Sequence, residues 1–156
     1  MNSYLALKAI HIISAAVLFG TGLGIAFFKW TADRSGTVAA IRLVTEKVVV
    51  ADWFFTLPAI LVQAASGVAL MRNLNYSLSQ TWLAWSIVLF CLAGLCWIPV
   101  VWLQIRMREL ARTSEREGAA SMGRQYQNYA LMWFWLGVPA FAAVLLIFWL
   151  MVTKPQ

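Results

Sequence analysis

The chain has 156 residues, of which 62% are hydrophobic and 12% are charged, and its mean hydropathy is +0.76. Soluble domains carry about 45–50% apolar and about 25% charged residues. The composition therefore excludes a soluble globular enzyme, and it also excludes a disordered chain, which would be poor in apolar residues. The twelve Lys and Arg outnumber the six Asp and Glu. Membrane topology accounts for this excess, so we expect a lipid bilayer around the chain and no nucleic-acid partner.

Four apolar stretches have the roughly 20-residue length that crosses a bilayer. They cover approximately residues 4–28, 48–71, 83–105 and 129–152. The first is not expected to be a cleavable signal peptide, because it lacks a basic start and its apolar run is too long. The sequence therefore predicts a single all-α domain over residues 1–156, an integral membrane four-helix bundle.

Basic residues predict the orientation of the bundle. Only Arg72 lies in the second connection, and only Lys154 lies in the C-terminal tail. Nine others follow the first and third spans, and these are Lys29, Arg34, Arg42, Lys47, Arg106, Arg108, Arg112, Arg116 and Arg124. Positive charge is retained on the cytoplasmic side. We therefore expect a multi-pass protein of the bacterial cytoplasmic (inner) membrane with both termini outside.

Two helices are expected to extend into the cytoplasm beyond their apolar stretches. Apolar residues recur at helical spacing before the second span, at Val38, Ile41 and Val44. The third span is followed by the stretch Arg106–Glu117, where charges of both signs indicate a solvated helical face. Gly118 would then allow a turn.

The first span contains the only histidine of the chain, His11, with Lys8 one turn earlier. Polar residues within apolar spans are functional candidates, because a buried polar group there needs an internal partner. Three interpretations of His11 stay open: a hydrogen bond to a neighbouring Gln or Ser, a cofactor ligand, or a proton relay. Lys8 either extends to the outer interface or pairs with an anionic group.

Small residues line another part of the first span. Ala16, Gly20 and Gly24 recur every four residues, a pattern that predicts close helix packing. Gly22 lies roughly on the histidine face and would leave room beside it for a flat group.

A polar stripe follows one face of the second helix. Its members are separated by seven, four, seven and three residues, and they are Thr45, Asp52, Thr56, Gln63 and Ser66. These intervals keep them on one side of a helix. We expect this side to face the interior of the bundle.

Two further expectations concern this stripe. Pro58 removes a backbone donor and predicts a local distortion of the helix. Asp52 is either a functional carboxylate or the structural partner of Lys29, Arg42 or Lys47.

Antiparallel packing allows depths in the membrane to be compared. His11 is expected level with Gln63 or Ser66 of the second helix, in the outer half of the membrane. Asp52 is expected near the cytoplasmic end. An interior site would thus hold an imidazole near its outer end and a carboxylate near its inner end.

Two segments carry a family resemblance. The order LKAIHIISAAVLFGTGLG at Leu7–Gly24 and the order TLPAILVQAASGVALM at Thr56–Met71 resemble a small bacterial integral membrane protein family of unknown function (domain-of-unknown-function family 2269). They are more distantly similar to HemJ-type protoporphyrinogen oxidases and to copper-resistance D-type membrane proteins. The resemblance implies a haem or porphyrin site whose histidine corresponds to His11.

The match to the HemJ-type pattern is incomplete. Thr56, Pro58 and Ala59 correspond to its second element. A second histidine near the end of the first helix is missing, and the stretch Phe27–Trp30 stands there instead. This departure weighs against protoporphyrinogen oxidation.

The leading functional expectation is a redox protein that binds haem b, with His11 as the axial metal ligand. Gln63 and Ser66 would fix the imidazole by hydrogen bonds, and Lys8 would neutralise a propionate. The sequence contains no GxGxxG, Walker A, HExxH or CxxCH motif, so a bound cofactor would have to carry any chemistry. Whether the protein is an enzyme stays open.

Two other classes of function stay open as well. A proton-coupled transporter or channel subunit would use Asp52 and Gln63, with His11 along the same polar path. A structural or assembly subunit of a larger membrane complex, or a homo-oligomer, would associate through the ridge that includes Gly20 and Gly24.

Overall fold

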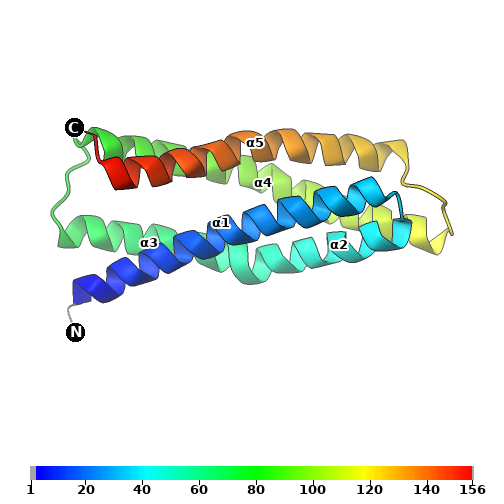
Figure 1. The fold of residues 1–156 in the computed structure, drawn as a ribbon, viewed down its shortest axis with the longest axis horizontal. Helices are drawn as coiled ribbons and strands as arrows, with labels where there is room; N and C mark the ends of the chain where they lie inside the picture. The colour runs from blue at the N-terminus through cyan, green and yellow to red at the C-terminus, as the bar shows by residue number, and fades with distance from the viewer. Residues whose placement is uncertain (1–2, 156) are drawn as a thin grey trace.

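The computed structural model describes residues 3–155, and the elements in this range are all helical. In chain order they are α1 (Ser3–Ser35), α2 (Val38–Ala51), the π-helical turn η1 (Asp52–Thr56), α3 (Leu57–Asn73), α4 (Thr81–Arg116) and α5 (Arg124–Thr153). The segments α2, η1 and α3 follow one another without a break, so the chain forms four long helices. Both ends of the chain lie at the same end of the bundle (Figure 1), which we call the terminal end; the other is the connection end.

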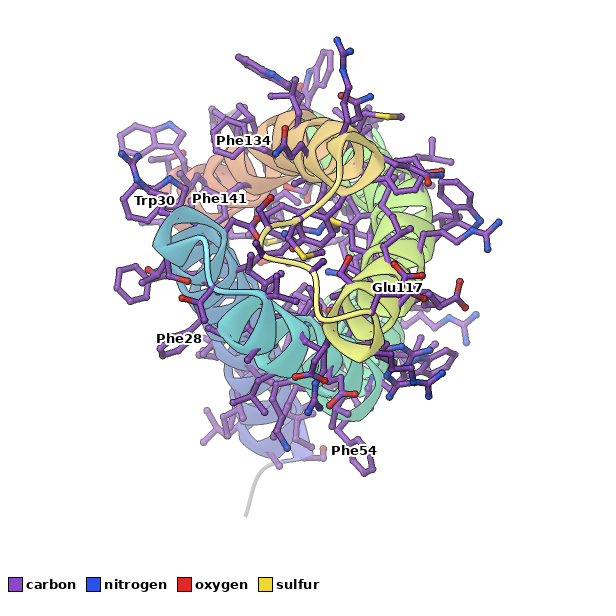
Figure 2. All side chains as sticks on the ribbon, turned by 90° about the vertical axis from the view of Figure 1, so that its right-hand side faces the viewer. Phe28, Trp30, Phe54, Glu117, Phe134 and Phe141 are labelled. Carbon is purple, nitrogen blue, oxygen red and sulfur yellow. The ribbon has the colours of Figure 1, made fainter. Side chains whose placement is uncertain are left out.

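All four helices are long and apolar enough to cross a membrane. Large apolar side chains cover the outside of the bundle: Phe54 is 74% exposed and Trp30 is 51% exposed. Figure 2 shows Phe28, Trp30 and Phe54 pointing away from the helices. A surface of this kind is stable only against hydrocarbon. The predicted integral membrane four-helix bundle is confirmed.

The expected helical extensions are present. The second long helix already begins at Val38, and α4 continues to Arg116. Ion pairs join these two extensions, because Glu46 accepts hydrogen bonds of 2.8 Å from both Arg42 and Arg112. After α4 the chain turns at Gly118, whose φ of +65° is the left-handed conformation that glycine adopts without strain.

Helix α1 is longer than the sequence predicts. Its apolar stretch was expected to end near Phe28, whereas the helix continues to Ser35. Lys29 and Asp33 form an i,i+4 ion pair in this added segment, a spacing that stabilises helices. The end of an apolar stretch therefore does not mark the end of this helix.

The four helices pack in two ways along the bundle. Near the connection end, α2, α4 and α5 share a buried core that includes Ile41, Leu103, Met107 and Tyr126. Toward the terminal end, α3 packs on α1 and α5 packs on α4. Phe19 of α1 also stacks on Phe141 of α5, and the hydrogen bonds of His11 with Gln63 and Ser66 join α1 to α3.

The turn η1 is a local distortion at a proline. Pro58 is the second residue of α3 and has no N–H to donate. Just before it, the N–H of Leu57 bonds the carbonyl of Asp52, five residues back. The predicted distortion at Pro58 is confirmed, and its form is a π turn, which is frequent at functional sites.

Candidate functional site

Polar side chains inside the bundle gather at three places. We call them the histidine cluster (His11, Ser14, Gln63 and Ser66), the aspartate site (Asp52, Thr56, Trp97 and Gln104) and the lysine cluster (Lys29, Asp33 and Tyr126). The first two contain the members of the polar stripe except Thr45, which is itself buried and donates to carbonyl oxygens of its own helix.

The histidine cluster joins α1 to α3. The Nδ1 atom of His11 lies 2.8 Å from Oγ of Ser66, and its Nε2 atom lies 3.0 Å from Nε2 of Gln63. Ser14 donates to the Oε1 atom of Gln63 and to the backbone carbonyl of His11. The depth predicted for His11, level with Gln63 and Ser66, is confirmed by these contacts.

The hydrogen bonds assign the tautomer of His11. The hydroxyl of Ser66 donates to the carbonyl of Val62 at 2.6 Å, so its oxygen accepts a proton from Nδ1 of His11. The Nε2 atom of His11 then accepts from the amide of Gln63. The ring also lies against α3, since a Cβ atom at Gly67 would be 3.4 Å from its Cε1 atom. The result is a neutral imidazole with both nitrogens bonded.

This geometry does not fit an axial haem ligand as it stands. Ligation of iron needs one free ring nitrogen, and both nitrogens of His11 are bonded to protein. A histidine that binds a metal through one ring nitrogen usually donates a hydrogen bond from the other, and the bond from Nδ1 of His11 to Ser66 has this form. The metal would then have to bind Nε2 of His11, but the amide of Gln63 bonds that nitrogen. Lys8 is exposed and lies one turn from His11 on α1. Haem on His11 stays a prediction, and it requires Gln63 to move.

The aspartate site lies at the π turn and faces α4. Asp52 is only 5% exposed, and its Oδ1 atom accepts a hydrogen bond of 2.7 Å from Thr56. Polar groups of Trp97 and Gln104 face it from α4. Within the part of the chain that the structure describes, Oδ2 of Asp52, Oε1 of Gln104 and Nε1 of Trp97 are buried without a hydrogen-bond partner.

Of the three structural partners expected for Asp52, Lys29 and Arg42 are paired elsewhere, and Lys47 is exposed. Lys29 bonds Asp33, with 2.6 Å between Nζ and Oδ2. Arg42 forms its ion pairs with glutamates of α2 and α4. Between residues 3 and 155, Asp52 has no ion pair. The interpretation of Asp52 as a partner of Lys29 or Arg42 is therefore wrong, because both cations find acidic groups closer along their own helices.

The lysine cluster was not predicted. Lys29 is only 1% exposed, and its Nζ atom donates to Asp33 at 2.6 Å and to the hydroxyl of Tyr126 at 3.2 Å. Tyr126 in turn donates to the Oδ1 atom of Asp33 at 2.6 Å. The ammonium group also lies 5.1 Å and 5.3 Å from the ring centres of Tyr126 and Trp133. The i,i+4 spacing of Lys29 and Asp33 was the one signal in the sequence.

The small-residue ridge of α1 lies on the surface. Ala16 and Gly20 are exposed, and Gly24 is half-buried. Among the described residues, nothing lies within 4 Å of the Cβ positions of Gly20, Gly22 or Gly24. The ridge makes no close packing inside this chain, and its use against a second chain stays a prediction.

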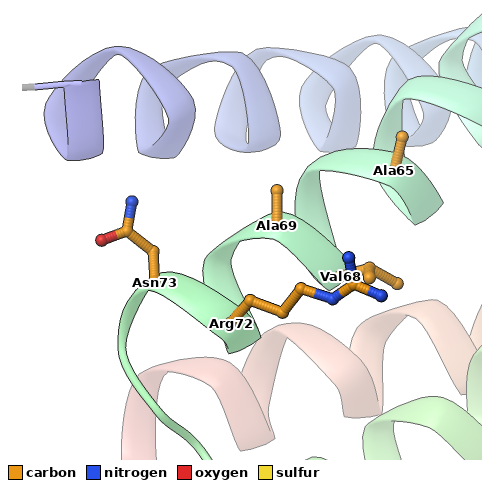
Figure 3. A pocket seen from close by; sticks show the side chains of 5 residues that line it. All are labelled: Ala65, Val68, Ala69, Arg72 and Asn73. Atoms are coloured by element: carbon orange, nitrogen blue, oxygen red, sulfur yellow. The ribbon is translucent and has the colours of Figure 1, made fainter.

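A hollow of about 500 Å³ lies along α3 near the terminal end. Ala65, Val68, Ala69, Arg72 and Asn73 line it, and the side chain of Arg72 runs back along the helix toward Val68 (Figure 3). All five residues belong to one helix, so the hollow brings no separate chemical groups together.

Among residues 3–155, no three His, Cys, Asp or Glu side chains are grouped as they would be to hold a metal ion.

Comparison with known proteins identifies a family for the chain. A family model described as a predicted integral membrane protein (DUF2269) matches residues 5–155. No curated protein and no solved structure shows a significant match to the chain.

Proposed function

We propose that this chain, which belongs to the DUF2269 family of predicted integral membrane proteins, binds and releases a proton at Asp52 and works as a proton-coupled transport subunit. The observation that carries the proposal is the buried Oδ2 atom of Asp52, which has no partner in the described range. Carboxylates within membrane spans are rare, and they are a common feature of proton pathways.

The chemistry of the aspartate site favours a proton. A charged carboxylate without a counter-ion is costly to bury. Oδ2 of Asp52 and Oε1 of Gln104 are both acceptors, so neither atom satisfies the other. In the described range, the indole N–H of Trp97 is the one donor of the aspartate site that is buried without a partner, and one donor does not satisfy two acceptors. A proton on Asp52 removes its charge and gives it an O–H group to donate, for example to Gln104. Thr56 is a positioning residue, because its hydroxyl holds the other carboxylate oxygen.

The π turn connects protonation of Asp52 with the conformation of the backbone. It is held by the bond between Leu57 and the carbonyl of Asp52 itself, so the backbone of Asp52 belongs to the distorted segment. Conversion between π and α geometry shifts the residues on either side by a fraction of a turn. A change of charge at Asp52 is thereby coupled to the packing of α2 and α3.

The histidine cluster lies farther along the same helix. Gln63 is eleven residues from Asp52, about 16 Å at the α-helical rise. Its bonds to His11 and Ser14 form a separate closed network. In this proposal the cluster holds α1 against α3, and Asp52 carries the proton.

The test is proton flux into proteoliposomes under an imposed pH gradient and membrane potential. We expect flux in the wild type, loss of flux in Asp52→Asn, and retention in Asp52→Glu, which keeps a carboxyl group. Thr45→Val is the matched control, since Thr45 is a buried polar residue of the same stripe that bonds only its own helix. Circular dichroism and thermal unfolding in detergent verify that all variants fold.

Infrared difference spectroscopy supplies an independent readout. We expect a C=O stretching band of a protonated carboxyl group that changes with pH in the wild type and disappears in Asp52→Asn. The proposal is overturned by a folded Asp52→Asn variant with wild-type flux. It is equally overturned when the wild type conducts no protons and the carboxyl band is insensitive to Asp52→Asn.

A further inference from the structure

Arg108 of α4 is a half-buried cation without a counter-ion among the described residues. Its Nε atom is buried and, between residues 3 and 155, has no hydrogen-bond acceptor. The neighbouring arginines of α4 are paired, Arg106 with Glu109 and Arg112 with Glu46. Buried donors of protein side chains normally have a partner, so Arg108 differs from its neighbours in a way that points to a missing acceptor.

Arg108 lies on the face of α4 that is turned toward the second long helix. Gln104 of this face lies against Asp52, and Arg112 donates to Glu46 with 2.8 Å between Nε and Oε1. Arg108 is four residues from each of them, so it occupies the middle of the same stripe. The Cα–Cβ bond of a helical residue tilts toward the N-terminus of its helix. For Arg108 this is the direction of Gln104 and the aspartate site.

The second long helix has one carboxylate left for Arg108. Glu46 and Asp52 are the two acidic residues of the segment from α2 to α3. The buried residues between them are Val48 and Val49, whose side chains accept no hydrogen bond. Glu46 already accepts from two arginines. The acceptor available one helical turn from Arg108 is therefore Asp52.

The other charged groups around Asp52 are paired or turned outward. Lys29 of α1 is held in the lysine cluster, to which α5 contributes Tyr126. Lys47 of α2 is exposed. Helix α3 carries no charged residue before its last turn. Within the described part of the chain, Arg108 and Asp52 are thus a cation and a carboxylate on facing helices, and neither has an ion pair.

We propose that Arg108 is the counter-ion of deprotonated Asp52, so that Asp52 exchanges Gln104 for Arg108 when it releases its proton. This inference rests on the proposed proton binding at Asp52 and describes the release step. With the proton on Oδ2, Asp52 donates to Oε1 of Gln104 and accepts from the indole N–H of Trp97, which satisfies the three atoms that lack partners.

Without the proton, the carboxylate is charged and Arg108 pairs with it across one helical turn. The proton passes from Oδ2 of Asp52 to water at the connection end, where the side chain of Arg108 is partly exposed. Arg108 is a positioning residue in this step, because its guanidinium group keeps its own protons.

The experiment titrates the C=O band of the protonated carboxyl group by infrared difference spectroscopy, with the full-length protein in proteoliposomes. Arg108→Gln removes the counter-ion and disfavours the charged carboxylate. We therefore expect the pH at which half of the band is lost to rise by about one to three pH units. The pH profile of proton flux should move in the same direction. Arg108→Lys keeps the positive charge and should recover most of the shift.

Two further variants separate pairing from general effects. Arg106→Gln is the matched control, because it removes the same charge from an exposed position of α4 and should leave the midpoint unchanged. Arg108→Met is a second neutral variant of similar length, so a folding defect of Arg108→Gln alone does not decide the result. Circular dichroism verifies the fold of each variant.

The outcomes distinguish this inference from the proposed function. A band that disappears in Asp52→Asn but has the same midpoint in the wild type, Arg108→Gln and Arg108→Met overturns the role of Arg108 and leaves proton binding at Asp52 intact. An equal rise in Arg106→Gln also overturns it, because surface charge would then be the cause. A band that is insensitive to Asp52→Asn removes the proposed function, and this inference with it.

Discussion

Among single residues, the side-chain amide of Gln63 decides whether His11 has a free ring nitrogen. Ser66 holds one ring nitrogen of His11, while Gln63 holds the other. The sequence predicted that these three residues meet, because helical depth follows directly from residue number in antiparallel spans. It did not predict which nitrogen each partner occupies, since side-chain rotamers depend on contacts between helices. That detail decides whether the imidazole is free to bind iron.

The haem hypothesis is testable through Gln63. If haem binds His11, it must displace the amide of Gln63, so Gln63→Ala is expected to raise haem occupancy above that of the wild type. His11→Ala is expected to abolish it. The measurement is the Soret absorbance per protein, purified from haem-supplied cells. Ser66→Ala, which leaves Nε2 of His11 capped by Gln63, is the control and should not increase occupancy. A Gln63→Ala preparation without a Soret band contradicts haem binding at His11.

At the scale of helices, the lysine cluster joins α1 to α5. Lys29 and Asp33 belong to α1, and Tyr126 belongs to α5. The sequence-based interpretation counted Lys29 among the charges that set topology and as a candidate partner of Asp52, and it did not connect Lys29 with Tyr126. Its aromatic partner lies 97 positions away, and no periodicity within one helix reveals such a pair. Helix periodicity did predict the helices themselves and the distortion at Pro58, because those features are local.

Removal of the carboxylate in this cluster should loosen the helix pair. In Asp33→Asn the buried ammonium of Lys29 loses its counter-ion, and we expect a loss of unfolding free energy of about 2 kcal/mol or more. Adding Lys29→Met removes the charge at similar length, so the double variant should recover most of that loss. Reversible unfolding in mixed micelles measures both. Equal stability of Asp33→Asn and the double variant would show that the charge of Lys29 is not the cause.

At the scale of the whole molecule, charge and polarity are arranged along the bundle axis. The connection end carries the ion pairs between α2 and α4 and the lysine cluster, whereas the terminal end carries few charges. The histidine cluster lies toward the terminal end, and the aspartate site lies between these two regions of the bundle. The sequence predicted the relative order of His11 and Asp52 from spacing, but not the lysine cluster. It missed the hollow between α1 and α5, because a cavity depends on how helices far apart in the chain are spaced.

The distribution of basic residues predicts the orientation of the bundle in the membrane. Nine Lys and Arg lie at or beside the connection end, against Lys8, Arg72 and Lys154 toward the terminal end. The inverted orientation would move all nine across the membrane, which the positive-inside rule disfavours. We therefore expect the connection end in the cytoplasm and both termini outside, in the cytoplasmic membrane of a bacterium.

Single cysteines test this orientation in intact cells. The two native thiols, Cys91 and Cys96, are free and are first replaced by Ala. Leu78, 61% exposed in the connection between α3 and α4, then becomes Cys and should react with a membrane-impermeant maleimide added outside. Ser121→Cys, in the connection between α4 and α5, should react only after lysis. The opposite labelling pattern would mean that the bundle is inverted, with the lysine cluster at the outer surface.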